Sequence, residues 1–193
     1  GGQPYTLVQL PISAFYDDNS FNVGSNDGFD FSRVKNVVIA MGGLYGPGFA
    51  VSFDDFAFQT APIETAVELV SFDDFNDGDT SNAGAFYGGS NGGAGTGPTT
   101  DRDGMDGMAL NLGVDPGTET MAGGTTAFAG FSVEAPGMGV DATGAEYFTF
   151  YIRPTVNEGN GRLVVEVNLQ EDANGDGTYD GATEDEYQAN IGI

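Results

Sequence analysis

Short segments in which apolar and polar residues alternate recur along the whole 193-residue chain, and they constrain its fold more than any other feature. Glycine, asparagine and aspartate separate these segments, a pattern typical of an all-β sandwich or barrel. No segment carries the apolar stripe of an amphipathic helix. The sequence therefore predicts an all-β, two-sheet antiparallel β-sandwich of the jelly-roll kind, with strands at residues 5–13, 34–41, 49–58, 67–75, 108–114, 126–135, 146–153, 162–171 and 186–191.

Two stretches are predicted to differ from these strands. Residues 76–107 are dominated by Gly, Asn, Ser, Thr and Asp, and they contain almost nothing that could anchor a core. They indicate a long surface loop. A short helical turn is expected around residues 31–34, where Asp30 or Ser32 can cap it.

The chain is strongly acidic, with a net charge of −24 from 29 acidic and 5 basic residues. Nucleic-acid binding needs clustered Lys or Arg, so a nucleic-acid partner is not expected. No apolar run approaches the roughly 18 residues that span a bilayer. Such a surface repels itself unless cations screen or bind it, so we expect bound calcium, a high-salt environment or both. Either condition favours an extracellular or cell-surface location.

The chain contains no cysteine and no histidine. These absences remove thiol nucleophiles, the commonest general base, and metal sites built on thiolate or imidazole. Paired carboxylates could serve a glycosidase, but acidic residues are so abundant here that a pair carries little information. We therefore expect a non-catalytic protein.

A hexapeptide occurs twice, because Val-Ser-Phe-Asp-Asp-Phe at residues 51–56 reappears at residues 70–75. Residues 61–66 between the copies are typical of a linker. If the two strands pair, aspartates from both copies converge, and like charges that close need a cation or a proton. Metal ligation and a solvated acidic edge are both compatible with this pattern, and the candidate ligands are Asp54, Asp55, Asp73 and Asp74.

Residues 172–180 carry the strongest local signal for a metal. Oxygen-bearing side chains recur at every second position and Gly177 occupies the sixth, as at the start of an EF-hand-like calcium loop. The twelfth position is Thr183, so the closing carboxylate must come from Glu184, Asp185 or elsewhere. The alternative is an acidic hairpin turn that binds nothing. The candidate calcium ligands are Asp172, Asn174, Asp176, Thr178, Asp180 and Glu184.

A third acidic group, at Asp101, Asp103 and Asp106, is more typical of Gly-rich turns than of a metal site.

One face of strand 146–153 is polar and aromatic, whereas the other is apolar. The next strand, 162–171, alternates in the same way. Side by side, the two strands would present one surface suited to sugars, since rings pack on sugar C–H faces while amides or carboxylates bind hydroxyls. An ordinary solvated sheet face is the alternative. The candidate sugar ligands are Tyr147, Tyr151, Arg153, Glu166 and Asn168.

Several segments resemble parts of a galactose-binding-like jelly roll. Residues 67–75, 107–112 and 140–153 are similar to its first two-thirds, and residues 8–15, 29–35 and 53–56 to its final third. The chain thus resembles, in permuted order, carbohydrate-binding modules of the family 11 and CIA30 type. The resemblance implies a polysaccharide ligand and a structural calcium ion joining the first and last strands.

The permuted order predicts that residues 1–60 supply the C-terminal strands of a sandwich module, 61–66 a linker, and 67–193 the N-terminal strands. Three arrangements satisfy it. The chain closes on itself as a circular permutant, it is one period of a tandem array, or it exchanges residues 1–60 with a neighbour in a head-to-tail assembly.

Together these observations predict a non-catalytic, secreted, calcium-stabilised β-sandwich module that binds carbohydrate. The alternative is a structural repeat or subunit of a head-to-tail cell-surface filament or adhesin stalk. The permuted order, which places both ends of the chain inside the sandwich repeat, supports that alternative, and so does the duplicated strand.

Overall fold

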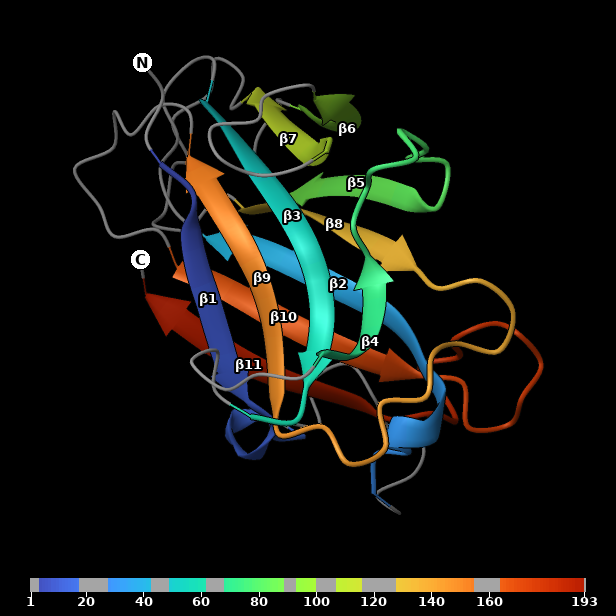
Figure 1. Cartoon of the computed structure of the whole chain (residues 1–193). Coiled ribbons are helices and arrows are strands. Elements are labelled where there is room, and N and C mark those ends of the chain that lie inside the picture. Colours follow the sequence, from blue (N-terminus) through green and yellow to red (C-terminus); the bar gives the residue numbers. More distant parts are fainter. Residues whose placement is uncertain are drawn as a thin grey trace.

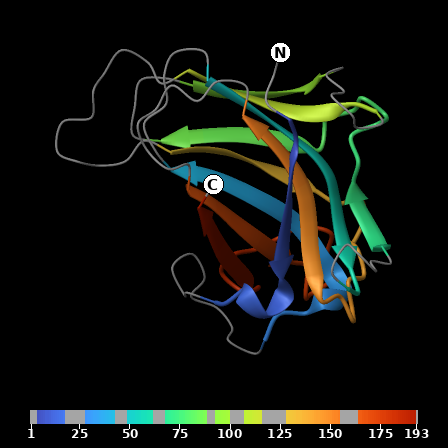
Figure 2. The ribbon, with the colours of Figure 1, turned by 60° about the vertical axis from the view of Figure 1, so that its left-hand side comes forward.

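The computed structural model describes residues 4–17, 28–42, 49–61, 68–88, 93–99, 107–115, 128–154 and 164–192. These residues form two antiparallel β-sheets packed as a sandwich (Figure 1). Figure 2 shows the sheets as two facing layers, with β9 and β3 in one and β2 and β10 in the other. No helix among the described residues is long and apolar enough to cross a membrane.

Sheet A has six strands. In order they are β1 (Thr6–Pro11), β9 (Tyr147–Pro154), β3 (Phe49–Gln59), β7 (Ala109–Asp115) and β6 (Gly93–Thr99), and β4 (Glu68–Asp73) also pairs with β3. Sheet B has five strands, in the order β11 (Glu186–Gly192), β10 (Val164–Glu171), β2 (Val34–Gly42), β8 (Phe128–Glu134) and β5 (Ala83–Gly88).

The two remaining regular elements are short 3₁₀ turns, η1 (Ile12–Ala14) and η2 (Phe31–Arg33). The carboxylate of Asp30 accepts a hydrogen bond from Ser32 N and caps η2. The predicted helical turn is therefore confirmed, together with the predicted all-β class and the nine predicted strands.

Alternation along each strand builds the core between the sheets. Phe148, Phe150 and Ile152 on β9 have no exposed surface. Phe53 on β3 contacts Phe131 on β8, with ring centroids 4.9 Å apart, so the rings join sheet A to sheet B. Burying such rings supplies the main favourable term in folding.

One prediction is wrong, because residues 76–107 do not form one long loop. They contain β5, which pairs with β8, and β6, which pairs with β7. Each of the two strands lies at an edge of its sheet, where backbone hydrogen bonds hold it. Edge strands rich in glycine need few apolar side chains, and for this reason the sequence pattern did not reveal them.

The two copies of the hexapeptide pair with each other. Strands β3 and β4 are antiparallel, with Phe56 opposite Asp73 and Ala57 opposite Ser71. β7 pairs with the first half of β3, from Phe49 to Phe53, so β4 and β7 share one edge of this strand. Strands from residues 1–60 therefore lie beside later strands of the same chain in both sheets.

Candidate functional site

A row of polar side chains crosses the outer face of sheet A. The core side chains of β3, β7 and β9 point inward, so Ser52, Asn111 and Arg153 point outward. Ser52 lies opposite both Asn111 and Arg153 in the sheet register. Asn111 Nδ2 donates to Ser52 Oγ (3.2 Å), and the Arg153 guanidinium stacks 4.5 Å from the ring centroid of Tyr5. These four residues are called the polar row.

The next row on this face holds Asp54 opposite Tyr151. Tyr151 is half-buried, whereas Asp54, like Ser52 and Arg153, is only 1% exposed. Tyr5, Asn111 and Tyr151 are therefore the partly exposed groups of these two rows, whereas Ser52, Asp54 and Arg153 are covered. Sequence reasoning identified Tyr151 and Arg153 but missed Tyr5, Ser52 and Asn111, and it treated Asp54 as a metal ligand. No sequence signal shows that β3, β7 and β9 align these residues with Tyr5, which lies one residue before β1.

Small residues continue the face toward the β6 edge. Gly97 lies opposite Asn111, and Gly95 lies opposite Gly113. A Cβ atom added at Gly95 or Gly97 would meet nothing within 4 Å, and at Gly113 it would meet only Gly95 O at 4.0 Å. None of the three has a positive φ, so neither packing against the described residues nor backbone conformation requires glycine there.

The five predicted sugar ligands do not share one surface. Tyr147, Tyr151 and Arg153 lie on β9 in sheet A, whereas Glu166 and Asn168 lie on β10 in sheet B. The predicted joint surface is wrong because the chain crosses from one sheet to the other between the two strands. Alternation tells which residues share a face of a strand, but it does not tell which sheet the strand joins.

The outer face of sheet B carries a network of amides and carboxylates. Asn168, only 4% exposed, donates from Nδ2 to Glu166 Oε1 (3.1 Å). Asn36 donates to Gln170 Oε1 (2.9 Å), and Gln170 Nε2 donates to Glu186 Oε2. These side chains hold strands β2, β10 and β11 together.

Residues 172–185, here called the acidic loop, join β10 to β11 and are tied by two carboxylates. The fully buried Asp172 accepts hydrogen bonds from the backbone N–H groups of Gly175, Asp176 and Gly177, at 2.8 to 3.0 Å. The buried Glu184 accepts from Asn174 N (3.1 Å) and Asp180 N (2.6 Å). Glu184 therefore does close the loop, but it does so onto backbone N–H groups.

The other predicted loop ligands lie outside this buried centre. Asn174, Asp176, Thr178 and Asp180 are exposed. The side-chain oxygens of Asn174, Asp176 and Asp180 each accept a hydrogen bond from the backbone N–H two residues later. Among the described residues, no group of three or more Asp, Glu, Cys or His side chains is arranged to hold a metal ion.

Acidic groups are concentrated under the loop. Glu171, Asp172, Glu184 and Asp185 are each at most 1% exposed. Burial raises the pKa of Glu171, although hydrogen bonds from Asp30 N and Asp185 N oppose this shift. Arg33 brings positive charge to the loop through Nη1, which donates to Ala173 O (2.9 Å). Several carboxylates are thus buried under the loop, and one guanidinium is hydrogen-bonded to the loop backbone.

The four aspartates of the repeated hexapeptide do not form one site. Asp54 lies on the outer face of sheet A, whereas Asp73 and Asp74 line a cleft of about 520 Å³ that Asp54 and Asp55 do not line. Burial raises the pKa of Asp73, and the charges that add to this shift are those of Asp77 and Asp74. The predicted convergence is therefore wrong, because β3 and β4 pair with Phe56 opposite Asp73.

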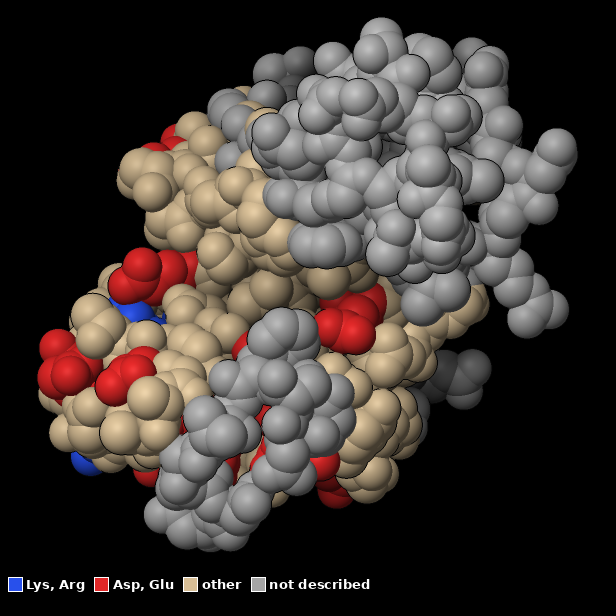
Figure 3. Space-filling view, turned by 180° about the vertical axis from the view of Figure 1, so that it is seen from behind, with Lys and Arg blue, Asp and Glu red and all other residues tan. Residues whose placement is uncertain are grey.

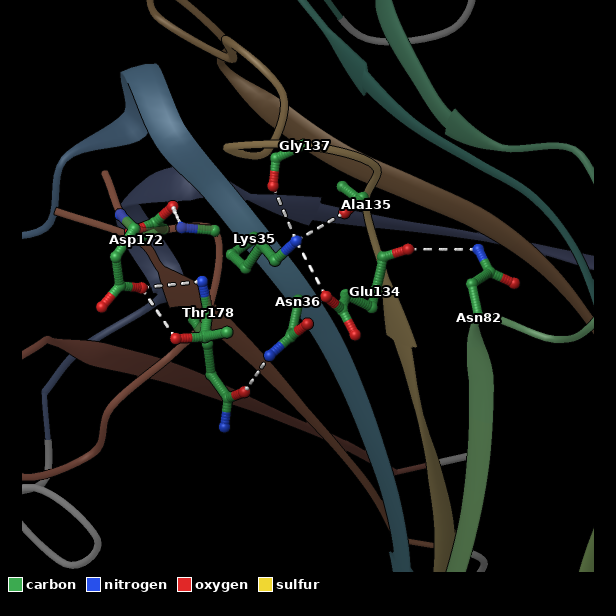
Figure 4. Close-up of polar contacts among 11 residues, drawn as sticks. Lys35, Asn36, Asn82, Glu134, Ala135, Gly137, Asp172 and Thr178 are labelled. Atoms are coloured by element: carbon green, nitrogen blue, oxygen red, sulfur yellow. Dashed lines mark hydrogen bonds and ion pairs between the residues drawn. The ribbon is translucent and has the colours of Figure 1, made fainter. Parts of the chain in front are cut away.

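This acidic cleft contains one buried cation. Besides Asp73 and Asp74, its lining includes Asp77, Asp79, Glu134 and Lys35. Lys35 Nζ donates to the carbonyl oxygens of Ala135 and Gly137 and forms an ion pair with Glu134, each at 2.8 Å (Figure 4). Figure 3 shows how acidic side chains outnumber basic ones on the side of the molecule away from the view of Figure 1.

Asp101, Asp103 and Asp106 lie outside the described residues, as does most of the predicted linker. Comparison with protein-family models, curated proteins and solved structures gave no match for this chain.

Proposed function

We propose that this chain is a non-catalytic, extracellular module that binds neutral carbohydrate on the outer face of sheet A. The observation that carries the proposal is the polar row, in which the buried Arg153 stacks on Tyr5 and the buried Ser52 accepts from Asn111, so that Tyr5 and Asn111 are held partly exposed on the same face as Tyr151. Fixed hydrogen-bonding groups beside aromatic rings suit sugar hydroxyls and C–H faces. The resemblance of several segments to galactose-binding-like carbohydrate modules supports the same function.

The chemistry of the face indicates the class of sugar. The chain carries a net charge of −24, which repels acidic polysaccharides. The face also lacks side chains over Gly95, Gly97 and Gly113, and glycine within strands often marks a close approach by a ligand. A long, neutral chain fits this surface better than a small charged sugar.

Retardation in gels that contain β-glucans, mannans or galactans tests the proposal. Removing the Tyr151 ring by Tyr151→Ala should weaken binding by about ten-fold or more, which corresponds to about 1.4 kcal/mol. Glu166→Ala, on the opposite sheet, is the matched control and should bind as the unchanged chain does. If none of these neutral polysaccharides retards the unchanged chain, the proposed function is wrong.

A glycine variant tests the open end of the same face. Gly97→Val places a β-branched side chain where an added Cβ meets no atom within 4 Å. The variant should fold with equal or greater stability because valine favours strands, yet it should lose polysaccharide binding. Unchanged retardation would show that the ligand does not reach β6.

We further propose that calcium stabilises the module through the acidic loop. The donors there are hard carboxylate, amide and carbonyl oxygens, as calcium requires. Asp172, Asn174, Asp176, Thr178, Asp180 and Glu184 are the candidate ligands, and binding would exchange the hydrogen bonds that Asp172 and Glu184 now accept from the backbone for contacts to the ion. When bound, calcium would neutralise carboxylates that are buried beside Arg33.

Chelation provides the test. EDTA should lower the melting temperature, and calcium at about 100 times its Kd should add about 2.7 kcal/mol to the free energy of unfolding. Asp176→Ala should reproduce most of the chelation effect. High monovalent salt is the control, since it screens charge without occupying a site. A melting temperature that EDTA leaves unchanged would contradict the calcium proposal.

A further inference from the structure

The peptide bond between Asn174 and Gly175 can take part in deamidation, a reaction that the proposed functions do not use. Gly175 has no side chain to hinder its backbone nitrogen from attacking Cγ of the preceding asparagine. In that reaction the Gly175 N–Cγ bond forms, the nitrogen loses its proton, and the side-chain amide leaves as ammonia. Water then opens the resulting succinimide at either carbonyl group, giving aspartate or isoaspartate.

The folded loop engages both reacting groups elsewhere. Gly175 N donates to Asp172 Oδ1 (2.8 Å), and the Asp172 carbonyl oxygen lies 3.3 Å from the same nitrogen. Asn174 Oδ1 accepts a hydrogen bond from Asp176 N (2.8 Å), which fixes the side-chain amide. The attack requires Gly175 N–H to leave Asp172 and the Asn174 side chain to turn toward that nitrogen.

Electrostatics adds to this protection. The attacking nitrogen must lose its proton, and the Asp172 carboxylate is fully buried next to it. A negative charge developing on nitrogen beside a buried carboxylate is strongly disfavoured. Asn174 is itself exposed, so access to water does not limit the reaction and the position of Gly175 N does.

We propose that Asn174–Gly175 is a site of spontaneous deamidation that Asp172 keeps unreactive while the acidic loop is closed. Opening the loop starts the reaction, and isoaspartate then inserts an extra methylene group into the backbone. The hydrogen bonds of Asp172 to Gly175, Asp176 and Gly177 depend on the original spacing. The modification therefore makes a reversible opening permanent.

Peptide mass spectrometry after ageing at neutral pH tests the proposal. In the folded chain, deamidation at Asn174 should be about ten-fold slower or more than in the urea-unfolded chain, because only the open loop reacts. Asp172→Asn, which removes the charge but retains one acceptor, should react several-fold faster than the unchanged chain. Ala182→Ser, at an exposed position of the same loop, leaves the Asp172 contacts in place and should react at the unchanged rate.

Asn174→Gln removes the signal and confirms its assignment, which separates it from the other two Asn-Gly pairs, at residues 91–92 and 160–161. Equal rates in the folded and urea-unfolded chain would overturn the proposal. A folded Asp172→Asn variant that reacts no faster than the unchanged chain would overturn it as well. If that variant does not fold, the ratio between the folded and unfolded rates of the unchanged chain decides alone.

Discussion

Asp30, Asp79 and Asp141 each accept a hydrogen bond from the backbone N–H two residues later, at 2.8 to 2.9 Å. The same contact recurs along the chain at Asp73, Asp74, Asp77, Asp176 and Asp180. Aspartate favours turns through this bond. Turn formation therefore explains eight of the 29 acidic residues without a ligand.

The carboxyl groups should divide into two classes by pKa. The hydrogen bonds from Ser81 and Thr143 lower the pKa of Asp79 and Asp141 below the ordinary value of 3.8, whereas burial raises those of Asp73 and Glu171 above 3.8 and 4.5. A carbon-13 NMR titration of the side-chain carboxyl groups measures each value. Asp73 titrating at or below 3.8 would contradict the structure.

The two classes act on stability in opposite directions. Asp79 and Asp141 bind protons more weakly in the folded state, so their contribution is present above pH 3.8 and is lost as the pH falls through the lowered values. Asp73 and Glu171 bind protons more tightly when folded. Their contribution is present below 3.8 and 4.5 respectively, and it is lost as the pH rises through the raised values.

Lys35 should contribute to stability mainly through its hydrogen bonds to carbonyl groups. Lys35→Met leaves Ala135 O and Gly137 O without this donor, which should cost about 2 kcal/mol. Glu134→Gln removes only an ion pair whose carboxylate side chain is 54% exposed, and should cost less than about 1 kcal/mol. Urea unfolding measures both. Equal losses would show that the ion pair dominates instead.

At the scale of elements, identical sequences adopt different conformations. In the first copy of the hexapeptide Asp55 has a φ of +52°, whereas in the second copy Phe75 has a φ of +53°. The bend therefore falls one residue later in the second copy. The first copy lies on β3, which pairs with β9 on one side and with β7 and β4 on the other. Among the described strands, the second copy pairs with β3 alone. The neighbouring strands therefore decide which residue takes the left-handed conformation.

Strand β8 should tolerate no side chain at Gly130. An added Cβ would overlap Ile39 O of β2 and lie 2.6 Å from Phe86 Cζ of β5, and the β2 backbone cannot retreat within the sheet. Gly130→Ala should therefore destabilise by about 2 kcal/mol in urea unfolding. Gly84→Ala is the control, since its Cβ would lie 3.6 Å from Ser132 Oγ. A neutral Gly130→Ala would contradict the packing of β8.

At the scale of the whole molecule, strands from early and late in the sequence fill both sheets. β1 and β3 pair with β9, and β2 lies between β8 and β10. The edge of β11 is partly covered, since Tyr16 forms a bridge with Gln188. Self-closure, a tandem array and exchange with a neighbour stay predictions, which the mass of the chain in solution distinguishes.

Light scattering tests self-closure. With calcium present, we expect the mass of a single chain, because both sheets are complete without a second copy. Long polymers would instead favour the head-to-tail filament or adhesin stalk. Repeating the measurement in high salt distinguishes general screening of the net charge of −24 from an effect of calcium itself.

The sequence by itself determined the strands that bury apolar side chains, the turn at η2 and the acidic loop, because alternation and turn chemistry are local properties. Only the tertiary structure decided that β9 and β10 lie in different sheets, and that β5 and β6 form edge strands. It alone aligned Ser52, Asn111 and Arg153. Sheet membership and register depend on contacts between distant segments, which no local pattern encodes.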